Sequence, residues 1–579
     1  MKTKFSIIIL FVFSFSSHSQ TNIFSTNPDV LEILKGNYNP QNYIPPIIIN
    51  HPDSIVKLFV DQISPDSLHA NLDILSSFYT RNSASDTVSN TIGIGAARRW
   101  AYQKFSDISS IRNSRLIPSY LQFDNTQICT VVQHRNIFAV LPGSDTTDKS
   151  IVLIEAHIDS RCKSLCDDTC LAQGMEDNGS GTALVLELAR VMSQCVYNRT
   201  IVFLLTIAEE QGLYGASAFA KYIQQNNIAI HAVLNNDIVG GVYCGNTSSQ
   251  PSCPGLGNID STHVRLFSDG GFNSPNKQFA RFVKLEYDEE ILPTSIVPTD
   301  LQIMSAEDRT GRGGDHIPFR QLFYTAIRIT SANENGNANT SNPTYIDRQH
   351  TSADILGLNT DIDPELDSFF VDFNYLTRNA IINSNAAAMA AIGPLTPDLS
   401  VSAISDSTVA VAITNQTQYN QYRIGMRTST NYFDSVFTFS NSLIDTISLD
   451  PSLFYAFSVA SVDSNGIESL FSREVLQNIV GVNRINNISK GIKILPNTPN
   501  PSDDQTHIKI ISDITLKNSS VYVSIHDALG KEVYHMPVEI HQGLNEVLYN
   551  HGFHVTGIFT CSLFVDGKKM DTVKMIFTN

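Results

Sequence analysis

The chain has 579 residues, of which 42% are hydrophobic and 16% are charged, and its formal net charge is -17. This length exceeds what one hydrophobic core can organise and predicts roughly three or four domains, while the hydrophobic content excludes an intrinsically disordered protein. The negative charge argues against nucleic acid and anionic membranes as partners, because neither attracts a polyanion.

The first residues have the pattern of a signal peptide. A basic start is followed by an apolar stretch from Phe5 to about Phe15, and Ser17 and Ser19 then offer the small side chains that signal peptidase prefers. We expect cleavage after residues 1–19. No later run approaches the roughly 18 apolar residues that a membrane span requires, so the sequence predicts an exported protein without an integral membrane span.

Residues 20–67 have the composition of an irregular, extended lead-in or propeptide-like segment. A helix is predicted from about Leu68, and an amphipathic helix over residues 95–105. Strands that are apolar throughout, separated by helices, then predict an α/β unit over residues 68–395, with a mostly parallel, mixed sheet and helices on both faces. The predicted strands lie at 136–143, 150–159, 200–208 and 231–240, and the predicted helices at 181–192 and 214–225.

The α/β pattern fades over AAAMAAIGPLTP, residues 386–397, where two prolines suggest a boundary. Beyond it the chain changes to short alternating strands separated by turn residues, as in STVAVAITN and LFYAFSVASVD. This texture predicts two small all-β sandwich domains, over residues 396–482 and 490–579.

Eight cysteines fit an oxidising compartment. Three of them, Cys162, Cys166 and Cys170, crowd one loop, which could be a thiolate metal site, although export favours disulfides. Cys244 and Cys253 could close a short loop of their own. The spacing alone leaves the connectivity open.

Polar residues cluster where the apolar strands end, which is where open α/β sheets bind their ligands. Each of four predicted elements contributes, and a distant loop with the sequence YIDRQHTSAD adds a histidine. The set is His157, Asp159, Asp177, Glu209, Glu210, Asp237 and His350.

Each of these residues has an ordinary structural explanation when taken alone. A strand-end histidine is often a satisfied core residue, Asp177 could cap the following helix, Asp237 could end its strand in an Asx turn, and the two glutamates could be solvated. Together they would concentrate anions in one crevice, at roughly 4 kcal/mol for each pair about 4 Å apart. Divalent cations remove this repulsion, and a mixture of imidazole and carboxylates suits zinc.

Two zinc ions about 3.5–4 Å apart can share one water and polarise a carbonyl group. Such a pair needs about five protein ligands and one further carboxylate as a base. The sequence supplies this inventory, with His157, Asp177, Glu210, Asp237 and His350 as candidate ligands and Glu209 as the candidate base.

The order of these motifs resembles the co-catalytic di-zinc exopeptidases of the bacterial leucyl aminopeptidase type, whose relatives include glutamate carboxypeptidases and glutaminyl cyclases. The resemblance covers residues 68 to about 392 and rests on His-x-Asp, Asp-x-Gly-Ser-Gly, Glu-Glu-x-Gly-Leu-x-Gly, Asp and a distant His. It implies two zinc ions per chain, bridged by Asp177, with His157 and Asp237 on one ion and Glu210 and His350 on the other.

The resemblance also implies that Glu209 is the general base that activates a zinc-bridging water, and that Asp159 orients His157. The expected enzyme is an aminopeptidase that hydrolyses N-terminal residues from peptides, with spare acidic groups to hold the α-ammonium. A carboxypeptidase or a glutaminyl cyclase on the same scaffold is the alternative, although five ligands suggest two ions and disfavour the cyclase.

Two departures from the family pattern accompany the match. Met175 and Glu176 precede Asp177, where the family has Ala and then an acidic or polar residue, and Gly314 stands before Asp315 and His316, where serine is common.

Other enzyme classes lack their motifs here. The chain has no His-Glu-x-x-His, no Gly-x-Ser-x-Gly and no P-loop, which removes the usual signatures of helix-borne zinc proteases, serine hydrolases and NTPases. A non-enzymatic alternative is an exported binding protein whose α/β domain has lost activity, but the complete set of ligands and base opposes it.

The two C-terminal units carry resemblances of their own. LDPSLFYAFSVASVDSNGIES resembles a fibronectin type III module, with Tyr455 in the position of its corner tyrosine. Residues 490–579 resemble the C-terminal sorting domain of the type IX secretion pathway, through Asn-Pro near 500, a turn from Asp527 to Lys531 and Gly-Ile-Phe near 557. This second resemblance implies recognition by the type IX machinery, passage across an outer membrane and a secreted or cell-surface location.

Overall fold

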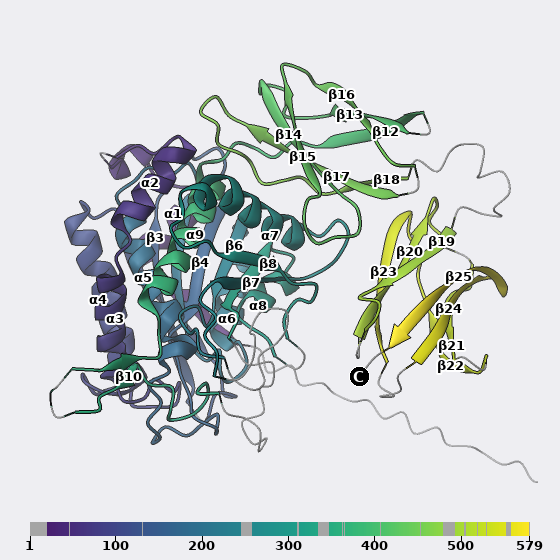
Figure 1. The fold of residues 1–579 in the computed structure, drawn as a ribbon. Coiled ribbons are helices and arrows are strands. Elements are labelled where there is room, and N and C mark those ends of the chain that lie inside the picture. The colour runs from purple at the N-terminus through teal and green to yellow at the C-terminus, as the bar shows by residue number, and fades with distance from the viewer. Residues whose placement is uncertain are drawn as a thin grey trace, which may run out of the picture.

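The computed structural model describes most of the chain, in three units arranged one after another (Figure 1). The described residues are 20–45, 47–129, 131–244, 257–309, 312–333, 347–361, 363, 365–405, 407–451, 453–478, 492–502, 505–517, 519–527, 530–551 and 557–577. No helix within these ranges is long and apolar enough to cross a membrane.

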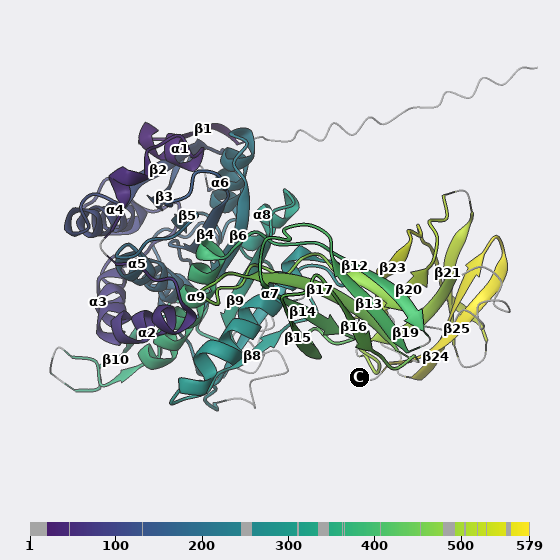
Figure 2. The ribbon, with the colours of Figure 1, turned by 90° about the horizontal axis from the view of Figure 1, so that it is seen from above.

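The first unit is built on a nine-stranded mixed sheet (Figure 2). Its strands are β1 (Thr21–Ser25), β2 (Ile117–Asp124), β3 (Gln133–Leu141), β4 (Ile151–His157), β5 (Thr200–Thr206), β6 (Ile230–Asn236), β7 (His263–Ser268), β8 (Asp300–Ile303) and β9 (Ala326–Ser331). They lie in the order β1-β2-β3-β5-β4-β6-β9-β7-β8. β4 runs parallel to β5 and β6, and β6 runs parallel to β9. The pairs β2–β3, β3–β5 and β7–β9 are antiparallel.

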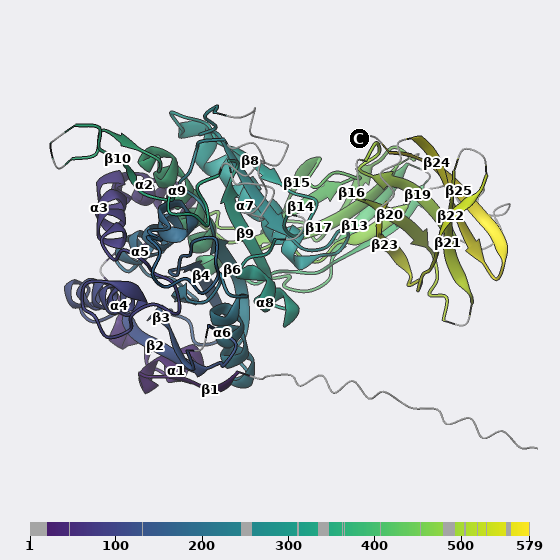
Figure 3. The ribbon, with the colours of Figure 1, turned by 90° about the horizontal axis from the view of Figure 1, so that it is seen from below.

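Helices cover both faces of this sheet. They are α1 (Pro28–Leu34), α2 (Pro52–Gln62), α3 (Pro65–Ser76), α4 (Gly93–Ile111), α5 (Ser180–Met192), α6 (Tyr214–Gln225), α7 (Pro275–Glu286), α8 (His316–Gln321) and α9 (Phe373–Ile392), with short helical turns η1 (Pro40–Tyr43), η2 (Met175–Gly179), η3 (Tyr287–Ile291) and η4 (Leu292–Thr294). α5 and α9 pack on β4, and α6 and α8 pack on β3, β6 and β9. α5 connects β4 to β5, and α6 connects β5 to β6, which lies on the other side of β4. The two connections therefore run in opposite directions along the sheet. Since both are right-handed crossovers, α5 and α6 lie on opposite faces (Figure 3).

The predicted α/β architecture is confirmed, including each strand and helix predicted between residues 95 and 240. The irregular lead-in predicted before residue 68 is wrong. β1 pairs antiparallel with β2 at the edge of the sheet, and α2 packs on α9, so this segment is part of the first unit. Its short elements escaped prediction because their stability comes from these distant partners, which local periodicity does not report.

The core of the first unit is filled by the apolar strands and the helices on them. Phe138 on β3 is fully buried, and its ring meets Phe219 of α6 edge to face, with 5.3 Å between centroids. We expect Phe138→Ala to lower the free energy of unfolding by about 3–5 kcal/mol, because the truncation leaves a cavity. Fluorescence of Trp100 in α4, the single tryptophan of the chain, reports this unit during urea unfolding. Phe323→Ala is the matched control, since that ring is 96% exposed and the change should stay within about 0.5 kcal/mol.

Two all-β units follow, as predicted, each with two facing sheets and a hydrophobic core of its own. The middle unit contains β12 (Leu399–Ser405), β13 (Thr408–Ile413), β14 (Gln421–Arg427), β15 (Ser435–Ser440), β16 (Ile444–Ser448), β17 (Phe454–Val462) and β18 (Val475–Asn478). The C-terminal unit contains β19 (Ile492–Thr498), β20 (Gln505–Ser512), β21 (Val521–His526), β22 (Glu532–Pro537), β23 (Gly543–Asn550), β24 (Gly557–Val565) and β25 (Lys568–Phe577). A two-stranded ribbon, β10 (Gly357–Leu358) and β11 (Ser368–Phe369), belongs to the first unit.

Candidate metal centre

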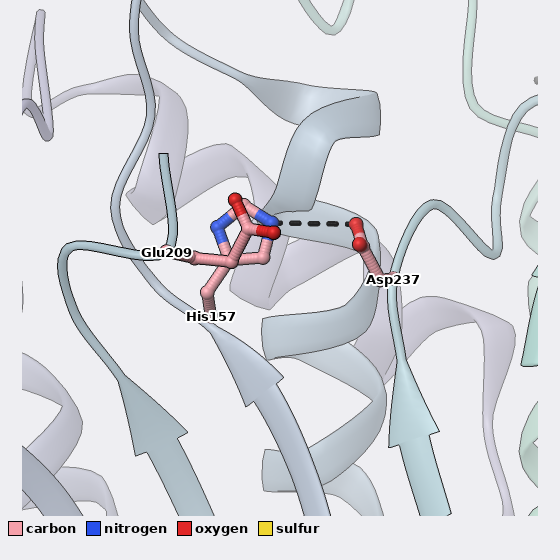
Figure 4. A group of neighbouring side chains, drawn as sticks. All are labelled: His157, Glu209 and Asp237. Atoms are coloured by element: carbon pink, nitrogen blue, oxygen red, sulfur yellow. Dashed lines mark hydrogen bonds and ion pairs between the residues drawn. The ribbon is translucent and has the colours of Figure 1, made fainter. Parts of the chain in front are cut away.

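The candidate site lies at the carboxyl ends of three neighbouring parallel strands. β4 ends at His157, Asp237 directly follows β6, and the pair Glu209–Glu210 follows β5. The strand order β5-β4-β6 reverses direction at β4, so these ends border the crevice in which open α/β sheets bind ligands. Figure 4 shows His157, Glu209 and Asp237 converging above the ends of their strands.

His157 is almost completely buried and points its Nε2 atom at two carboxylates. Nε2 lies 3.2 Å from Oδ1 of Asp177 and 3.3 Å from Oδ1 of Asp237. On the other side of the ring, Nδ1 lies 3.1 Å from the main-chain carbonyl of Asp159. A proton on Nδ1 satisfies that carbonyl and leaves Nε2 as a lone-pair donor, which is the tautomer that a metal ligand requires.

Asp177 lies between the two predicted histidines. Its Oδ1 faces His157, and its Oδ2 lies 2.9 Å from Nε2 of His350, which arrives from the loop after β9. The same Nε2 of His350 lies 3.2 Å from Oε2 of Glu210. Asp177 therefore presents one oxygen to each histidine. The following helix, α5, begins at Ser180, and its N-cap residue is Gly179 with no side-chain cap, so Asp177 does not serve as the N-cap of α5.

These residues form two groups of metal donors. His157, Glu209 and Asp237 form one, and Asp177, Glu210 and His350 form the other, with the donor atoms of each group within 4.8 Å of one another. Oε1 of Glu210 is buried and has no hydrogen-bond partner among the described residues. One imidazole and two carboxylates in each group are the ligand types that suit zinc, so the residues present fit that metal.

The electrostatics of the centre reflect this crowding. Burial alone would lower the pKa of His157, but the carboxylates of Glu209, Asp159, Asp177 and Asp237 raise it well above its ordinary value. Burial raises the pKa of Glu209 well above its ordinary range, and the neighbouring Asp237 and Glu210 add to the rise, against the opposing effect of His157. The side chain of Glu209 is only partly buried, so it can reach a molecule in the cavity.

Asp159 binds the backbone of the glutamate pair. It is fully buried, and its two carboxylate oxygens accept hydrogen bonds from the backbone amides of Glu209 and Glu210, each at 3.3 Å. Ser83, from the segment between α3 and α4, donates a third hydrogen bond at 3.3 Å. Asp159 Oδ1 also lies 3.5 Å from Nδ1 of His157, so the residue predicted to orient His157 contacts both halves of the centre.

Two arginines at the centre were missed by sequence reasoning. Nε of Arg161 donates to Oε2 of Glu210 at 2.6 Å, and Nη2 of Arg328 lies 3.0 Å from Oδ2 of Asp237. The sequence contained a signal for each arginine. Arg161 lies two residues after Asp159, and Arg328 is a charged residue within the otherwise mostly apolar strand β9. Each arginine fixes the direction of one carboxylate.

Asp354 and Asp315 are buried carboxylates outside the two donor groups. Asp354 accepts hydrogen bonds from the backbone amides of Glu176 and Asp177, at 2.8 and 3.0 Å, and so holds the turn that carries Asp177. Asp315 accepts a hydrogen bond from Thr206. Burial raises the pKa of each carboxyl to about 7.

The departure at Gly314 has a steric reason. A Cβ atom there would lie 3.1 Å from Cδ of Arg328 and 3.3 Å from Nδ1 of His316, so a serine would be tightly packed and would require these side chains to shift slightly. His316 itself is fully buried, with Nε2 3.2 Å from the carbonyl of Glu307, and belongs to neither donor group.

His316 makes the stability of the protein depend on pH. Burial lowers its pKa to about 4, whereas an unfolded histidine titrates near 6.5. Between these values the unfolded chain binds more protons, so this contribution is complete above pH 6.5 and is lost as the pH falls, by up to about 3 kcal/mol. In urea titrations, the free energy of unfolding of the wild type should fall as the pH is lowered from 6.5 to 4. We expect that of His316→Gln to fall less over the same range. His541→Gln, at an exposed site, should follow the wild type, and parallel curves for all three proteins would refute this assignment.

Two disulfides hold the loop that begins at Arg161. Cys129 pairs with Cys166, and Cys162 with Cys170, which confirms disulfides over a thiolate metal site. Cys253, the predicted partner of Cys244, lies outside the described residues.

A cavity of about 330 Å³ opens directly onto the centre. Asp177, Glu209, Glu210, Asp237 and His350 contribute to its wall, so the candidate ligands and the candidate base face the same space.

A family model and a curated relative agree with this chemistry. A model of the family described as Peptidase family M28 matches residues 136–252. A probable zinc metalloprotease of Leptosphaeria maculans is 32% identical over 57% of this chain and 75% of its own length. Among solved structures, the LapA aminopeptidase of Legionella pneumophila is 19% identical, with a TM-score of 0.41, over 58% of this chain and 75% of that chain. A glutaminyl cyclase of Porphyromonas gingivalis is 16% identical, with a TM-score of 0.38, over 56% and 98%.

Proposed function

The chain belongs to peptidase family M28 and is a zinc metalloprotease, and on this premise we propose that it is an aminopeptidase that binds two zinc ions and removes N-terminal residues from peptides. The observation that supports two ions is the position of Asp177, whose two oxygens face His157 and His350 at 3.2 and 2.9 Å. In this proposal Asp177 is shared, His157 and Asp237 hold one ion, and Glu210 and His350 hold the other.

Zinc bound there would supply Lewis acidity to the peptide carbonyl and to the attacking water. The residues of the chain would do the rest. Glu209 would take the proton from the water with a carboxylate oxygen and pass it to the leaving amine. Asp159 would fix the backbone of Glu209 and Glu210, since its two oxygens accept hydrogen bonds from their backbone amides. The base and the metal ligand would thus keep their separate positions.

The test is a panel of peptides that differ in their termini, assayed with and without a chelator. An aminopeptidase should hydrolyse peptides with a free N-terminus, spare N-acetylated ones, tolerate C-terminal amides, and lose activity with chelator until zinc is restored. Metal analysis should find about two zinc ions per chain. Cleavage of N-acetylated peptides with a free C-terminus would instead identify a carboxypeptidase, and cyclisation of N-terminal glutamine a glutaminyl cyclase.

We also propose that the protein is exported and that residues 490–579 act as a type IX sorting domain. The residues that carry this resemblance lie in a β unit with a hydrophobic core of its own, in which hydrogen bonds to Gly530 and Lys531 close the turn at Asp527. Fractionation with antibodies to each end should find extracellular protein without the C-terminal unit. Intact protein confined to the periplasm would refute the proposal.

The middle unit is proposed to be a fibronectin type III-like module over residues 396–482. Its support is the hydroxyl of Tyr455, which accepts a hydrogen bond at 3.1 Å from the backbone amide of Asp450, five residues upstream, as in a tyrosine corner. Limited proteolysis of the full chain should cut near these boundaries before it cuts inside the unit, although Ala460, Ile467 and Phe471 pack against the first unit and should hold the nicked pieces together. Cleavage inside β14 or β17 before the boundaries would argue against an independent module.

A further inference from the structure

The middle unit shares an apolar contact with the first unit. Ala460, Ile467 and Phe471 belong to the middle unit in sequence, yet they are buried in the hydrophobic cluster that forms the core of the first unit. Phe433 packs on Phe471, with 4.7 Å between the ring centroids. Separation of the two units would expose these side chains to water, so the contact has the apolar character of a permanent interface.

A buried ion network crosses the same interface. Arg281, on α7 of the first unit, lies 3.2 Å from Oε1 of Glu474 in the middle unit, and both side chains are 1% exposed. Arg427, at the end of β14, donates to Oε2 of Glu474 at 2.9 Å, and the backbone amide of Asn273 donates to the same oxygen at 2.8 Å. Because a buried charge that loses its partner is strongly destabilising, this network opposes separation of the two units.

The loop between β14 and β15, residues 428–434, contacts the edge strand β8 of the nine-stranded sheet (Figures 2 and 3). β8 is the last strand in the order, so one of its edges has no neighbour among the described strands. The backbone N–H of Ile303 in β8 donates to the hydroxyl of Tyr432 at 3.3 Å, and its carbonyl accepts from Nδ2 of Asn431 at 3.0 Å. The loop thus binds backbone groups that a bare sheet edge would leave unpaired.

The same loop fixes the segment that leads from β8 to the metal centre. Nδ2 of Asn431 also donates to Oγ of Ser305, at 3.0 Å. Three residues further on, Asp308 accepts a hydrogen bond from Arg328 at 2.8 Å, and Arg328 lies 3.0 Å from the candidate ligand Asp237. The contact with the middle unit and the contact with Arg328 are therefore only three residues apart on one short segment.

We propose that the middle unit is a permanent part of the catalytic body, and that its loop of residues 428–434 positions the wall of the metal centre through Ile303 and Ser305. Asn431 is a positioning residue, since it does not line the cavity at the centre. The inference goes beyond the proposed function. Its folding test depends neither on zinc nor on peptide cleavage, whereas its zinc test rests on the ligands assigned above.

Urea unfolding of the full chain, followed by the fluorescence of Trp100 in the first unit, tests whether the two units form one body. Ile424→Ala removes a fully buried side chain from the core of the middle unit. We expect the Trp100 transition to move to lower urea by about 0.5 M or more, because one body unfolds as a whole. A transition that Ile424→Ala does not move would overturn the inference.

Ile510→Ala is the matched control, because it makes the same change in the core of the C-terminal unit. It should leave the Trp100 transition within about 0.1 M of the wild type. An equal shift from both changes would show a loss of stability unrelated to this interface and would also overturn the inference. Ile424→Val and Ile510→Val give the same comparison with smaller shifts if the alanine variants do not fold.

Zinc affinity, measured on folded protein by competition with a chelator, tests the positioning role. Asn431→Ala should raise the zinc dissociation constant about three- to tenfold, less than the roughly 10–100-fold that follows loss of a residue directly supporting a ligand. Asn420→Ala, at an exposed position of the same unit, is the control and should bind zinc as the wild type does. An unchanged dissociation constant in Asn431→Ala would refute the positioning role.

A double variant tests whether Asn431 acts through Asp308. Asp308→Asn weakens the contact with Arg328, so adding Asn431→Ala should weaken zinc binding no further. Two effects that multiply would assign Asn431 another route and overturn the inference.

The inference and the proposed function fail separately. If wild-type protein binds no zinc, the ligand assignment fails, and the Trp100 transition still decides whether the two units form one body. If Asn431→Ala weakens zinc binding in a protein that removes no N-terminal residue, the aminopeptidase fails and the positioning role stands.

Discussion

Replacing Glu209 by Gln is expected to lower kcat for peptide hydrolysis by about 10²–10⁴-fold while leaving the zinc content unchanged. The amide has nearly the shape of the carboxylate but cannot accept the proton of the attacking water. Asp159 binds the backbone amide of residue 209, so the position of the segment does not depend on this side chain. Steady-state kinetics and metal analysis on the same preparation measure both quantities.

The neighbouring glutamate provides the matched comparison. Glu210→Gln makes the same chemical change one residue away, on a side chain whose Oε2 lies 3.2 Å from Nε2 of His350. It should lose zinc as well as activity. If Glu209→Gln lost one ion and Glu210→Gln kept both, Glu209 would be the metal ligand and Glu210 the base. This outcome needs to be measured because Glu209 lies in one donor group with His157 and Asp237.

Replacing Asp177 by Ala is expected to weaken both ions at once, because this carboxylate belongs to both halves of the centre. Loss of a ligand should cost more than the roughly 10–100-fold in metal affinity that follows loss of a residue supporting a ligand. Zinc content should fall from about two to less than one per chain, and peptide hydrolysis should be abolished.

Thermal or urea unfolding gives a readout that does not depend on turnover. A ligand that binds the folded state stabilises it by about 2.7 kcal/mol per site at 100 times its dissociation constant. Zinc should therefore stabilise wild-type protein strongly and Asp177→Ala weakly, whereas Asp107→Asn, on the exposed face of α4, should behave as wild type. An Asp177→Ala protein that retained two ions would rule out a shared ligand.

The parts of the fold that sequence predicted are those in which local pattern and tertiary environment agree. β4, β5 and β6 are mostly apolar and mostly buried because helices cover both of their faces, and this burial is visible in the residues themselves. The polar residues at their ends were predictable for the same reason, since the end of an apolar run marks the rim of a buried sheet. β1 and α2 were not predictable, because their partners β2 and α9 are remote in the chain.

The site shows the same division. The order of the motifs suggested which residues converge, but not how carboxylates and arginines pair. Arg328 reaches Asp237 from another strand, and Arg161 reaches His350 across 189 positions of sequence. The disulfide connectivity also depends on distances in three dimensions, with Cys129 reaching Cys166 from a separate loop. Such pairings are decided by the tertiary fold.

The two disulfides around Cys162 and Cys166 have a practical consequence for anyone who prepares this enzyme. They anchor the loop whose first residue, Arg161, touches both Glu210 and His350. Protein made in a reducing bacterial cytoplasm would carry four thiols in place of these cross-links, and thiols themselves capture zinc. Metal counts and affinities taken from such material would describe a different molecule, so the stoichiometry is best measured on protein folded under oxidising conditions.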